Sequence, residues 1–418
     1  MDTITHGIVG ALAGKALFAG RDSPALSADG TLSQAQSSLT ARAAIAACTI
    51  GSIFPDSDVF AGPLARNPLA IIEWHRNITH SLVMLPLWAA LLAAVSMPVA
   101  RWLRWKAPPF PILFIIYVVG LATHVFLDVV TSFGTMVWSP LRYSRVAWDW
   151  LFIIDLTLTA LALVPQLAAW CYRDPRKFEA RAGTVWAALT VGAFCGYALA
   201  ASVGYGFAIW AVGAISAIFA LVLFGPAIRG AGFEWKRSAW CRAGLALVCA
   251  YLALASGMHR KALADVDAFA AARHLPSKNL AAIPLPPTLT HWAGVISTPE
   301  GVWRATIREP GGIIERTQLY SDAQSDRHVG EAEKLHDVQV YLWFARFPIW
   351  LVRQREGQTI LEVSDVRFFR EEDPNADPEN QQSARSFGIR PNAPGFTFQI
   401  VFDVNGRVVS SGFKKPDQ

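Results

Sequence analysis

Six apolar stretches of the sequence are each long enough to cross the hydrocarbon core of a bilayer, which takes about 20 helical residues. They run over residues 79–99, 110–131, 149–169, 183–201, 205–226 and 239–257. Two shorter apolar segments, 4–19 and 41–54, either span while tilted among their neighbours or enter the bilayer only partway. Only 17% of the residues are charged, against roughly a quarter in an average soluble domain. The sequence therefore predicts a mainly α-helical, polytopic bundle of six to eight transmembrane helices.

Basic residues gather in three of the loops between these stretches, at 101–106, 173–181 and 229–242. The positive-inside rule assigns such loops to the cytoplasmic side. If both short segments span, eight crossings leave both termini on the outer side of the cytoplasmic (inner) membrane. The formal charge of +5 is dispersed over short clusters, which is typical of topology signals. We therefore expect membrane lipids as partners, and no nucleic acid.

The character of the sequence changes after the last apolar stretch. Residues 261–274 have the pattern of an amphipathic helix, and Pro284, Pro286 and Pro287 predict a stiff linker. We expect three regions: a transmembrane helical domain over 1–258 with a metal site in 1–135, an amphipathic helix and proline-rich linker over 259–289, and a β-rich domain over 290–418.

The last region contains short alternating segments such as VWRATI, VQVYLWF and FTFQIVFDV, separated by Pro, Gly and Asp. This pattern predicts a small antiparallel β domain from about Thr290 to Gln418. Asn405 and Gly406 lie between two such segments and predict a hairpin with a type I′ turn, because both residues tolerate a positive φ. We expect this domain outside the membrane, on the outer side and beside the candidate metal ligands.

Ionisable side chains in apolar segments are costly, about 2.5–3.5 kcal/mol each at a helix centre, so they require a reason. In the first 135 residues they occur in sets of histidine and aspartate, and each set lies at or near one end of an apolar segment. The sets are Asp2 with His6, Asp56 with Asp58, His75 with His80, and His124 with Asp128.

His124 and Asp128 are four residues apart in an apolar helix, which places both side chains on one helical face. Imidazole together with carboxylate suits Zn²⁺, and Mn²⁺ or another divalent ion is an alternative. Without a metal, the same pair would be an interhelical hydrogen-bond pair that holds the bundle together.

Asp56 and Asp58 follow Pro55, and an extended backbone would direct both carboxylates to the same side. Their alternative use is as ordinary turn residues at the end of a helix. His75 and His80 are five apart and suit a loop followed by a helix start, where Thr79 would be the N-cap.

Arg76 lies between these two histidines in the motif HRNITHS. Its guanidinium could neutralise an anionic group such as a phosphate, since it binds phosphate through two parallel hydrogen bonds. The alternative is a snorkelling side chain at the membrane interface.

The motifs MDxxTHxxxG, PDxD, HRxxTHS and HxxxDxxTxxG follow one another over residues 1–135. In this order they resemble the YdjM-like family of inner-membrane proteins, which are regarded as metal-dependent hydrolases. The resemblance implies a divalent metal centre held by His6, Asp56, His75, His80, His124 and Asp128, with Asp2 and Asp58 as weaker candidates. The His/Asp pattern is also similar to the zinc-dependent phospholipase C and nuclease fold, which would place Met1 or Asp2 near the site.

No GxSxG, P-loop, HExxH or dinucleotide-binding motif is present in the sequence. The preferred hypothesis is a membrane-embedded metal-dependent hydrolase that acts on a lipid or lipid-linked ester or phosphodiester. In this hypothesis a metal-activated water attacks, Asp58 is the general base and Arg76 contacts the substrate. The alternatives are a metal-binding transporter and a non-catalytic membrane scaffold.

Overall fold

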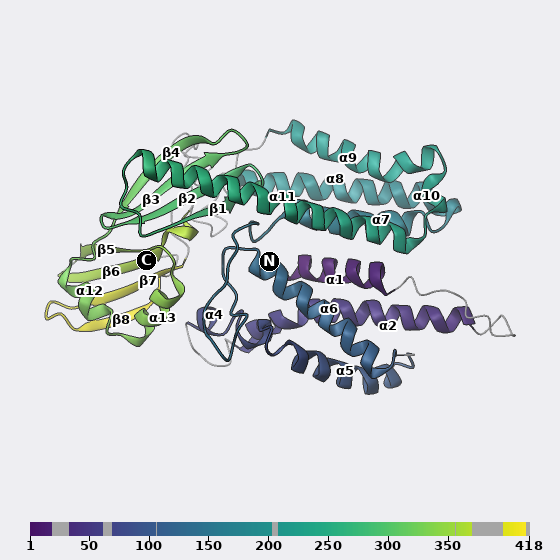
Figure 1. Ribbon diagram of the computed structural model, residues 1–418, viewed down its shortest axis with the longest axis horizontal. Coiled ribbons are helices and arrows are strands. Elements are labelled where there is room, and N and C mark those ends of the chain that lie inside the picture. The colour runs from purple at the N-terminus through teal and green to yellow at the C-terminus, as the bar shows by residue number, and fades with distance from the viewer. Residues whose placement is uncertain are drawn as a thin grey trace.

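The computed structural model describes residues 1–18, 33–61, 69–105, 107–202, 208–355, 357–369 and 396–414. Long helices lie side by side along the long axis of the molecule, and two small β-sheets lie at one end of them (Figure 1). The predicted fold class, a helical bundle followed by an antiparallel β region, is confirmed.

The bundle is built from eight long helices of the described chain. They are α1 (Thr3–Leu17), α2 (Ser33–Ile53), α5 (Leu85–Trp102), α6 (Phe110–Val129), α7 (Leu156–Cys171), α8 (Phe178–Ser202), α9 (Trp210–Ile228) and α11 (Arg237–Ala272). Five helical segments are long and apolar enough to cross a membrane: Ala41–Phe60, Leu85–Trp102, Phe110–Val129, Trp210–Ile228 and Arg237–Ala272. The predicted polytopic bundle therefore rests on these five, with α7 as a shorter apolar helix.

Two helix starts differ from the predicted apolar stretches. Helix α5 begins at Leu85 and not at residue 79, because residues Ile78–His80 form a separate 3-10 turn, η2. Helix α7 begins at Leu156, where Asp155 accepts a hydrogen bond from the Leu158 backbone and caps the helix. In both places the apolar sequence continues outside the helix, into the loops that surround the candidate site.

Helix α11 joins two predicted elements into one. It includes the last predicted span and almost all of the predicted amphipathic helix, and continues without a break to Ala272. Its apolar first part packs against α7 and α1, and its last part packs against the first sheet, where Val266 and Phe269 contact Trp292. Since one rigid helix serves both domains, it fixes the position of the sheets relative to the bundle.

The C-terminal region consists of two four-stranded antiparallel sheets. The first has the order β1 (Asn279–Leu285), β2 (His291–Thr298), β3 (Gly301–Arg308) and β4 (Ile313–Ser321), and the second β5 (Pro348–Arg355), β6 (Gln358–Asp365), β7 (Thr397–Phe402) and β8 (Val408–Phe413). The sheets begin earlier than expected, because β1 occupies part of the predicted linker and Pro284 pairs with Trp292 inside it.

Two local predictions for this region are wrong. The segment VQVYLWF forms helix α13 (His336–Phe344) and not a strand, because Val338, Tyr341 and Phe344 recur every three residues and are all buried. Between β7 and β8, only Gly406 has a positive φ, and the Asp403 backbone N–H donates to the Arg407 carbonyl. The hairpin is present, but its turn is a longer loop and not type I′.

The second sheet and its helices pack against loops of the bundle. Leu69, Ile72 and Phe133 belong to the same buried apolar cluster as Phe344 and Phe398 of the C-terminal region. The β region therefore lies at the end of the bundle where α1 and α7 begin and α2 and α6 end (Figure 1). The tail therefore lies next to the loop of Phe133, whose ring contacts that of His75.

Candidate metal centre

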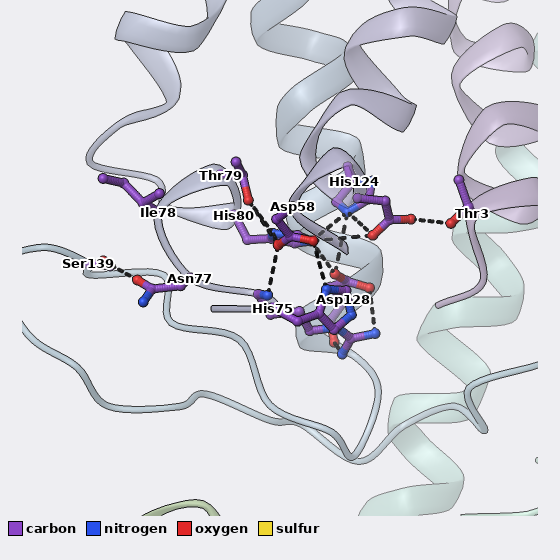
Figure 2. Close-up of polar contacts among 12 residues, drawn as sticks. Thr3, Asp58, His75, Asn77, Ile78, Thr79, His80, His124, Asp128 and Ser139 are labelled. Atoms are coloured by element: carbon purple, nitrogen blue, oxygen red, sulfur yellow. Dashed lines mark hydrogen bonds and ion pairs between the residues drawn. The ribbon is translucent and has the colours of Figure 1, made fainter. Parts of the chain in front are cut away.

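Four polar side chains from three separate parts of the chain meet at this end of the bundle. They are Asp56 of the 3-10 turn η1 (Phe54–Phe60), His80 of η2, and His124 and Asp128 of α6. All four are buried, and each offers one ligand atom within 4.8 Å of the others. We refer to these four residues as the central cluster, of which Figure 2 labels His80, His124 and Asp128.

The two imidazoles of the central cluster face each other through their Nε2 atoms, which are 3.0 Å apart. The Nδ1–H of His124 donates to the Ser52 carbonyl at 2.7 Å. A carbonyl can only accept, so the hydrogen of the neutral ring is on Nδ1 and the lone pair is on Nε2.

The same conclusion holds for His80. The Thr79 hydroxyl donates to Asp58 Oδ2 at 3.1 Å, so its oxygen accepts from His80 Nδ1 at 3.0 Å. The His80 Nε2 lone pair therefore also points into the cluster. Two lone pairs and two carboxylates are all acceptors, and acceptors that converge in a buried space require a cation between them.

The spacing of these acceptors fits a tetrahedral ion. Each histidine Nε2 lies 3.5 Å from Asp56 Oδ1, and Asp128 Oδ2 lies 3.2 Å from His80 and 3.4 Å from His124. Zinc bonds of 2.0–2.1 Å in a tetrahedron place neighbouring ligand atoms about 3.3 Å apart. The residues of the central cluster therefore fit a divalent metal, with two nitrogen and two oxygen donors.

The other oxygen of Asp128 is held by three donors. Asp128 Oδ1 accepts from the Met1 amine at 2.6 Å, from Arg76 Nη2 at 2.8 Å and from His6 Nε2 at 3.2 Å. These contacts orient the carboxylate so that Oδ2 faces the two histidines. Met1 therefore lies beside the site, as the resemblance to the phospholipase C and nuclease fold implied.

Arg76 does not take up the snorkelling alternative, and its contact with an anionic substrate stays a prediction. It is fully buried, so it does not snorkel, and its guanidinium holds Asp128 and the Thr131 hydroxyl. Its Nε is buried without a hydrogen-bond partner. The geometry assigns it to positioning Asp128.

His6, predicted as a metal ligand, lies against the central cluster but outside it. Its ring stacks on His124 with centroids 3.7 Å apart, and its Nδ1 is buried without a partner. Asp2, a weaker candidate, caps α1 by accepting from the Thr5 backbone and hydroxyl.

His75 and Asp58 form a second group, which shares His80 with the central cluster. The two aspartates do not point the same way as expected, because η1 is a 3-10 turn and not an extended segment. Asp58 accepts from His75 Nδ1 at 2.9 Å, from the Arg76 backbone and from Thr79 (Figure 2). These bonds leave Asp58 little freedom to act as a base itself. Thr79 is also not a helix cap, since α5 begins later.

Two residues of the site were missed by the sequence analysis. The Thr3 hydroxyl donates to Asp56 Oδ2 at 2.5 Å, and the Ser52 carbonyl orients His124. Thr3 lies inside the motif that opens the chain, so its position near His6 in the sequence could have indicated that it belongs to the site. A backbone carbonyl gives no signal in the sequence.

A bundle of apolar helices that encloses a buried His/Asp cluster at one end defines an integral membrane protein with a candidate metal centre. The family model of the YdjM inner membrane protein matches residues 1–208 of this chain. Residues 1–208 are therefore similar to this family, as the motifs over residues 1–135 indicated, and the family name supports a location in the inner membrane. No curated protein and no solved structure matches the chain.

Proposed function

We propose that this protein is a membrane-embedded, metal-dependent hydrolase that acts on a lipid or lipid-linked ester or phosphodiester. The observation that carries the proposal is the convergence of four buried acceptors in the central cluster at ligand spacing. When bound, a divalent ion, for which Zn²⁺ is our first choice, supplies Lewis acidity and lowers the pKa of a water molecule.

In this proposal the residues around the central cluster fix its geometry. Asp58 acts through Thr79 and His80, and the Ser52 carbonyl acts on His124, so that both Nε2 atoms face inward. Hydrogen bonds of this kind set the tautomer and the orientation of ligand imidazoles.

We assign the proton-accepting role to His75 and not to Asp58. His75 donates Nδ1–H to Asp58, which leaves the Nε2 lone pair to accept a proton. Its side chain is 20% exposed, whereas that of His80 is fully buried. A base needs this access to exchange its proton with water.

The position of the centre supports a lipid substrate. The loop between α6 and α7 exposes Trp138, Tyr143 and Trp148, and amphipathic rings of this kind favour the level of lipid headgroups. A substrate anchored in the bilayer would therefore present its polar bond at the depth of the central cluster. We also propose that this end of the bundle and the β region lie on the periplasmic side.

The position also favours an enzyme over a transporter. A transport site is expected near the bilayer midplane, between repeated halves of the protein. The central cluster instead takes its ligands from the end of α6 and from the 3-10 turns η1 and η2.

The test uses the full chain purified in a neutral detergent. Hydrolysis of bis(4-nitrophenyl) phosphate, 4-nitrophenyl butyrate and a fluorescent phosphatidylcholine in mixed micelles would be followed before and after EDTA treatment. We expect turnover of at least one of these to stop with EDTA and to return with Zn²⁺ or Mn²⁺.

The matched variants are Asp128→Asn and Asp155→Asn, both at buried carboxylates of the bundle. Asp128→Asn should abolish turnover, whereas Asp155→Asn should retain it because the Asp155 oxygens accept from the Leu158 backbone and the Tyr251 hydroxyl and belong to neither candidate metal group. Turnover that survives both EDTA and Asp128→Asn would refute the proposed mechanism.

A further inference from the structure

A pocket of about 280 Å³ lies where the α6–α7 loop meets the C-terminal region. Aromatic rings and guanidinium groups line it from both sides of this junction. The residues that matter here are Phe133, Arg145, Trp343, Phe344, Arg346 and Arg367. The volume is sufficient for a phosphate group together with part of a headgroup.

The charges of this pocket do not cancel. Arg346 pairs with Asp149 at 2.9 Å, and Arg367 pairs with Asp365 at 2.7 Å. Arg145 makes no such pair with any described carboxylate. Among the described residues, one cation of the pocket therefore has no carboxylate partner.

Arg145 is instead held in place by neutral groups. Its guanidinium donates to the carbonyls of Ile72, His75 and Gly134 and lies 5.2–5.4 Å from the ring centroids of Phe133, Trp343 and Phe344. Its Nε is buried and has no hydrogen-bond partner among the described residues. Burying a donor without a partner is costly, and an anion in the pocket would remove that cost.

The pocket adjoins the candidate metal centre. Arg145 lies 5.4 Å from the centroid of the Phe133 ring, and Arg76, which holds Asp128, lies 5.1 Å from the same centroid. Arg145 also donates to the carbonyl of His75 at 3.3 Å. A ligand in the pocket would therefore lie next to the residues that surround the central cluster.

A second pocket of about 330 Å³ shares Ala147 and Arg346 with the first. Its walls include Trp148, Trp150 and Leu263. Together the two pockets offer a cationic part and an adjoining part rich in apolar side chains. This division matches a molecule with an anionic head and an apolar body.

We propose that the first pocket binds the phosphate group of an amphiphile, with Arg145 as its principal cation, and that the second pocket receives the adjoining apolar part. If the bound amphiphile is the substrate of the metal centre, the assignment also rests on the proposed hydrolase function. Binding of the phosphate itself requires no metal. Guanidinium groups suit this role because their charged N–H groups make strong hydrogen bonds to phosphate oxygens, and Arg145 Nε is the donor that the carbonyls of Ile72, His75 and Gly134 leave available.

The test measures binding to the full chain in neutral detergent with EDTA present, by isothermal titration calorimetry. The probes are dihexanoyl phosphatidate, inorganic phosphate and uncharged dihexanoylglycerol. We expect phosphatidate to bind at least about tenfold more tightly than either of the others, because only it occupies both pockets.

Two pairs of variants test the pocket residues. Ser144→Asp places a negative charge in the lining without removing Arg145, and Ser144→Asn is its neutral control. Arg145→Gln removes the uncompensated cation, and Arg142→Gln changes an exposed arginine of the same loop. We expect Ser144→Asp and Arg145→Gln to weaken phosphatidate binding about tenfold or more, and both controls to retain it.

The outcomes separate this inference from the proposed function. If inorganic phosphate binds as tightly as phosphatidate, the ligand is a free anion and the proposal of an amphiphile is overturned. If dihexanoylglycerol binds as tightly as phosphatidate, the proposal that the pocket recognises phosphate is overturned. If phosphatidate does not bind in EDTA but turnover depends on added Zn²⁺ or Mn²⁺, the pocket assignment alone is overturned. If phosphatidate binds in EDTA but no turnover depends on added metal, the pocket is supported and the metal-dependent hydrolase is refuted.

Discussion

The helices that carry the central cluster differ from helix α9 in what they bury. Helix α6 buries both His124 and Asp128, whereas α9 contains no ionisable residue and exposes 57% of Ile218 and 71% of Leu221. Buried ionisable groups in a membrane protein are expensive and are retained where they serve a function. The comparison locates the chemistry in the first helices and indicates that α9 serves mainly as a lipid-facing element.

The same two helices also differ in how closely they pack. At Gly120 of α6, a Cβ atom would lie 2.5 Å from the Cys48 carbonyl and 3.1 Å from the Gly51 Cα of helix α2. At Gly213 of α9, a Cβ atom would meet nothing within 4 Å. Backbones approach this closely only where small residues allow it. Close packing of α2 on α6 holds Ser52 against His124, so it belongs to the construction of the site.

The largest expected effect is on metal affinity in His124→Ala. The substitution removes one nitrogen donor, so the cation that would lie between the two buried carboxylates is held less tightly. We expect the metal affinity to fall by more than about 100-fold. Loss of a residue that only orients a ligand typically lowers metal affinity about 10- to 100-fold. Competition with a chromogenic chelator would measure the affinity, and Asp155→Asn should bind like the wild type.

A smaller loss is expected in Asp58→Asn. The variant keeps the shape of the side chain but removes the charge that holds Thr79 and His75 and thereby orients His80. We expect metal affinity to fall about 10- to 100-fold, the usual cost of losing such a partner. An affinity equal to that of the wild type would show that Asp58 does not position His80. In that case its role would lie with His75 alone.

The smallest effect is expected from a pair of glycine substitutions. Gly120→Ala should destabilise the protein by about 1–3 kcal/mol, because the new methyl group has no space against Cys48. Gly213→Ala should leave the thermal midpoint in detergent unchanged, since its surroundings are open. Equal midpoints for the two variants would contradict the packing difference between α6 and α9.

Much of the fold could be predicted from the sequence because hydropathy reports directly on membrane helices. The predicted stretches failed mainly at their ends, as at residues 149–155. There Thr131 pairs with Leu151, and Asp149 adopts a positive φ and pairs with Arg346. These contacts are tertiary, so an apolar composition alone does not reveal that the segment is a loop.

The site was predictable where its geometry is local. The spacing of His124 and Asp128 on one helix placed both in the central cluster, since four residues bring side chains to one face. Asp56 and Asp58 separated because a 3-10 turn replaced the expected extended backbone. The contact of Arg76 with Asp128 spans 52 residues, and no local pattern could have indicated it.

The most direct test of the central claim is X-ray absorption at the zinc edge of the full chain loaded with one equivalent of Zn²⁺. The geometry of the central cluster predicts a first shell of two nitrogen donors and at least two oxygen donors at about 2.0–2.2 Å, with no sulfur, and the proposed hydrolysis requires one further oxygen from water. The spectrum of His124→Ala should lose one imidazole contribution. A first shell with sulfur, or a wild-type shell with no imidazole contribution, would contradict the assignment of Asp56, His80, His124 and Asp128 as a metal centre.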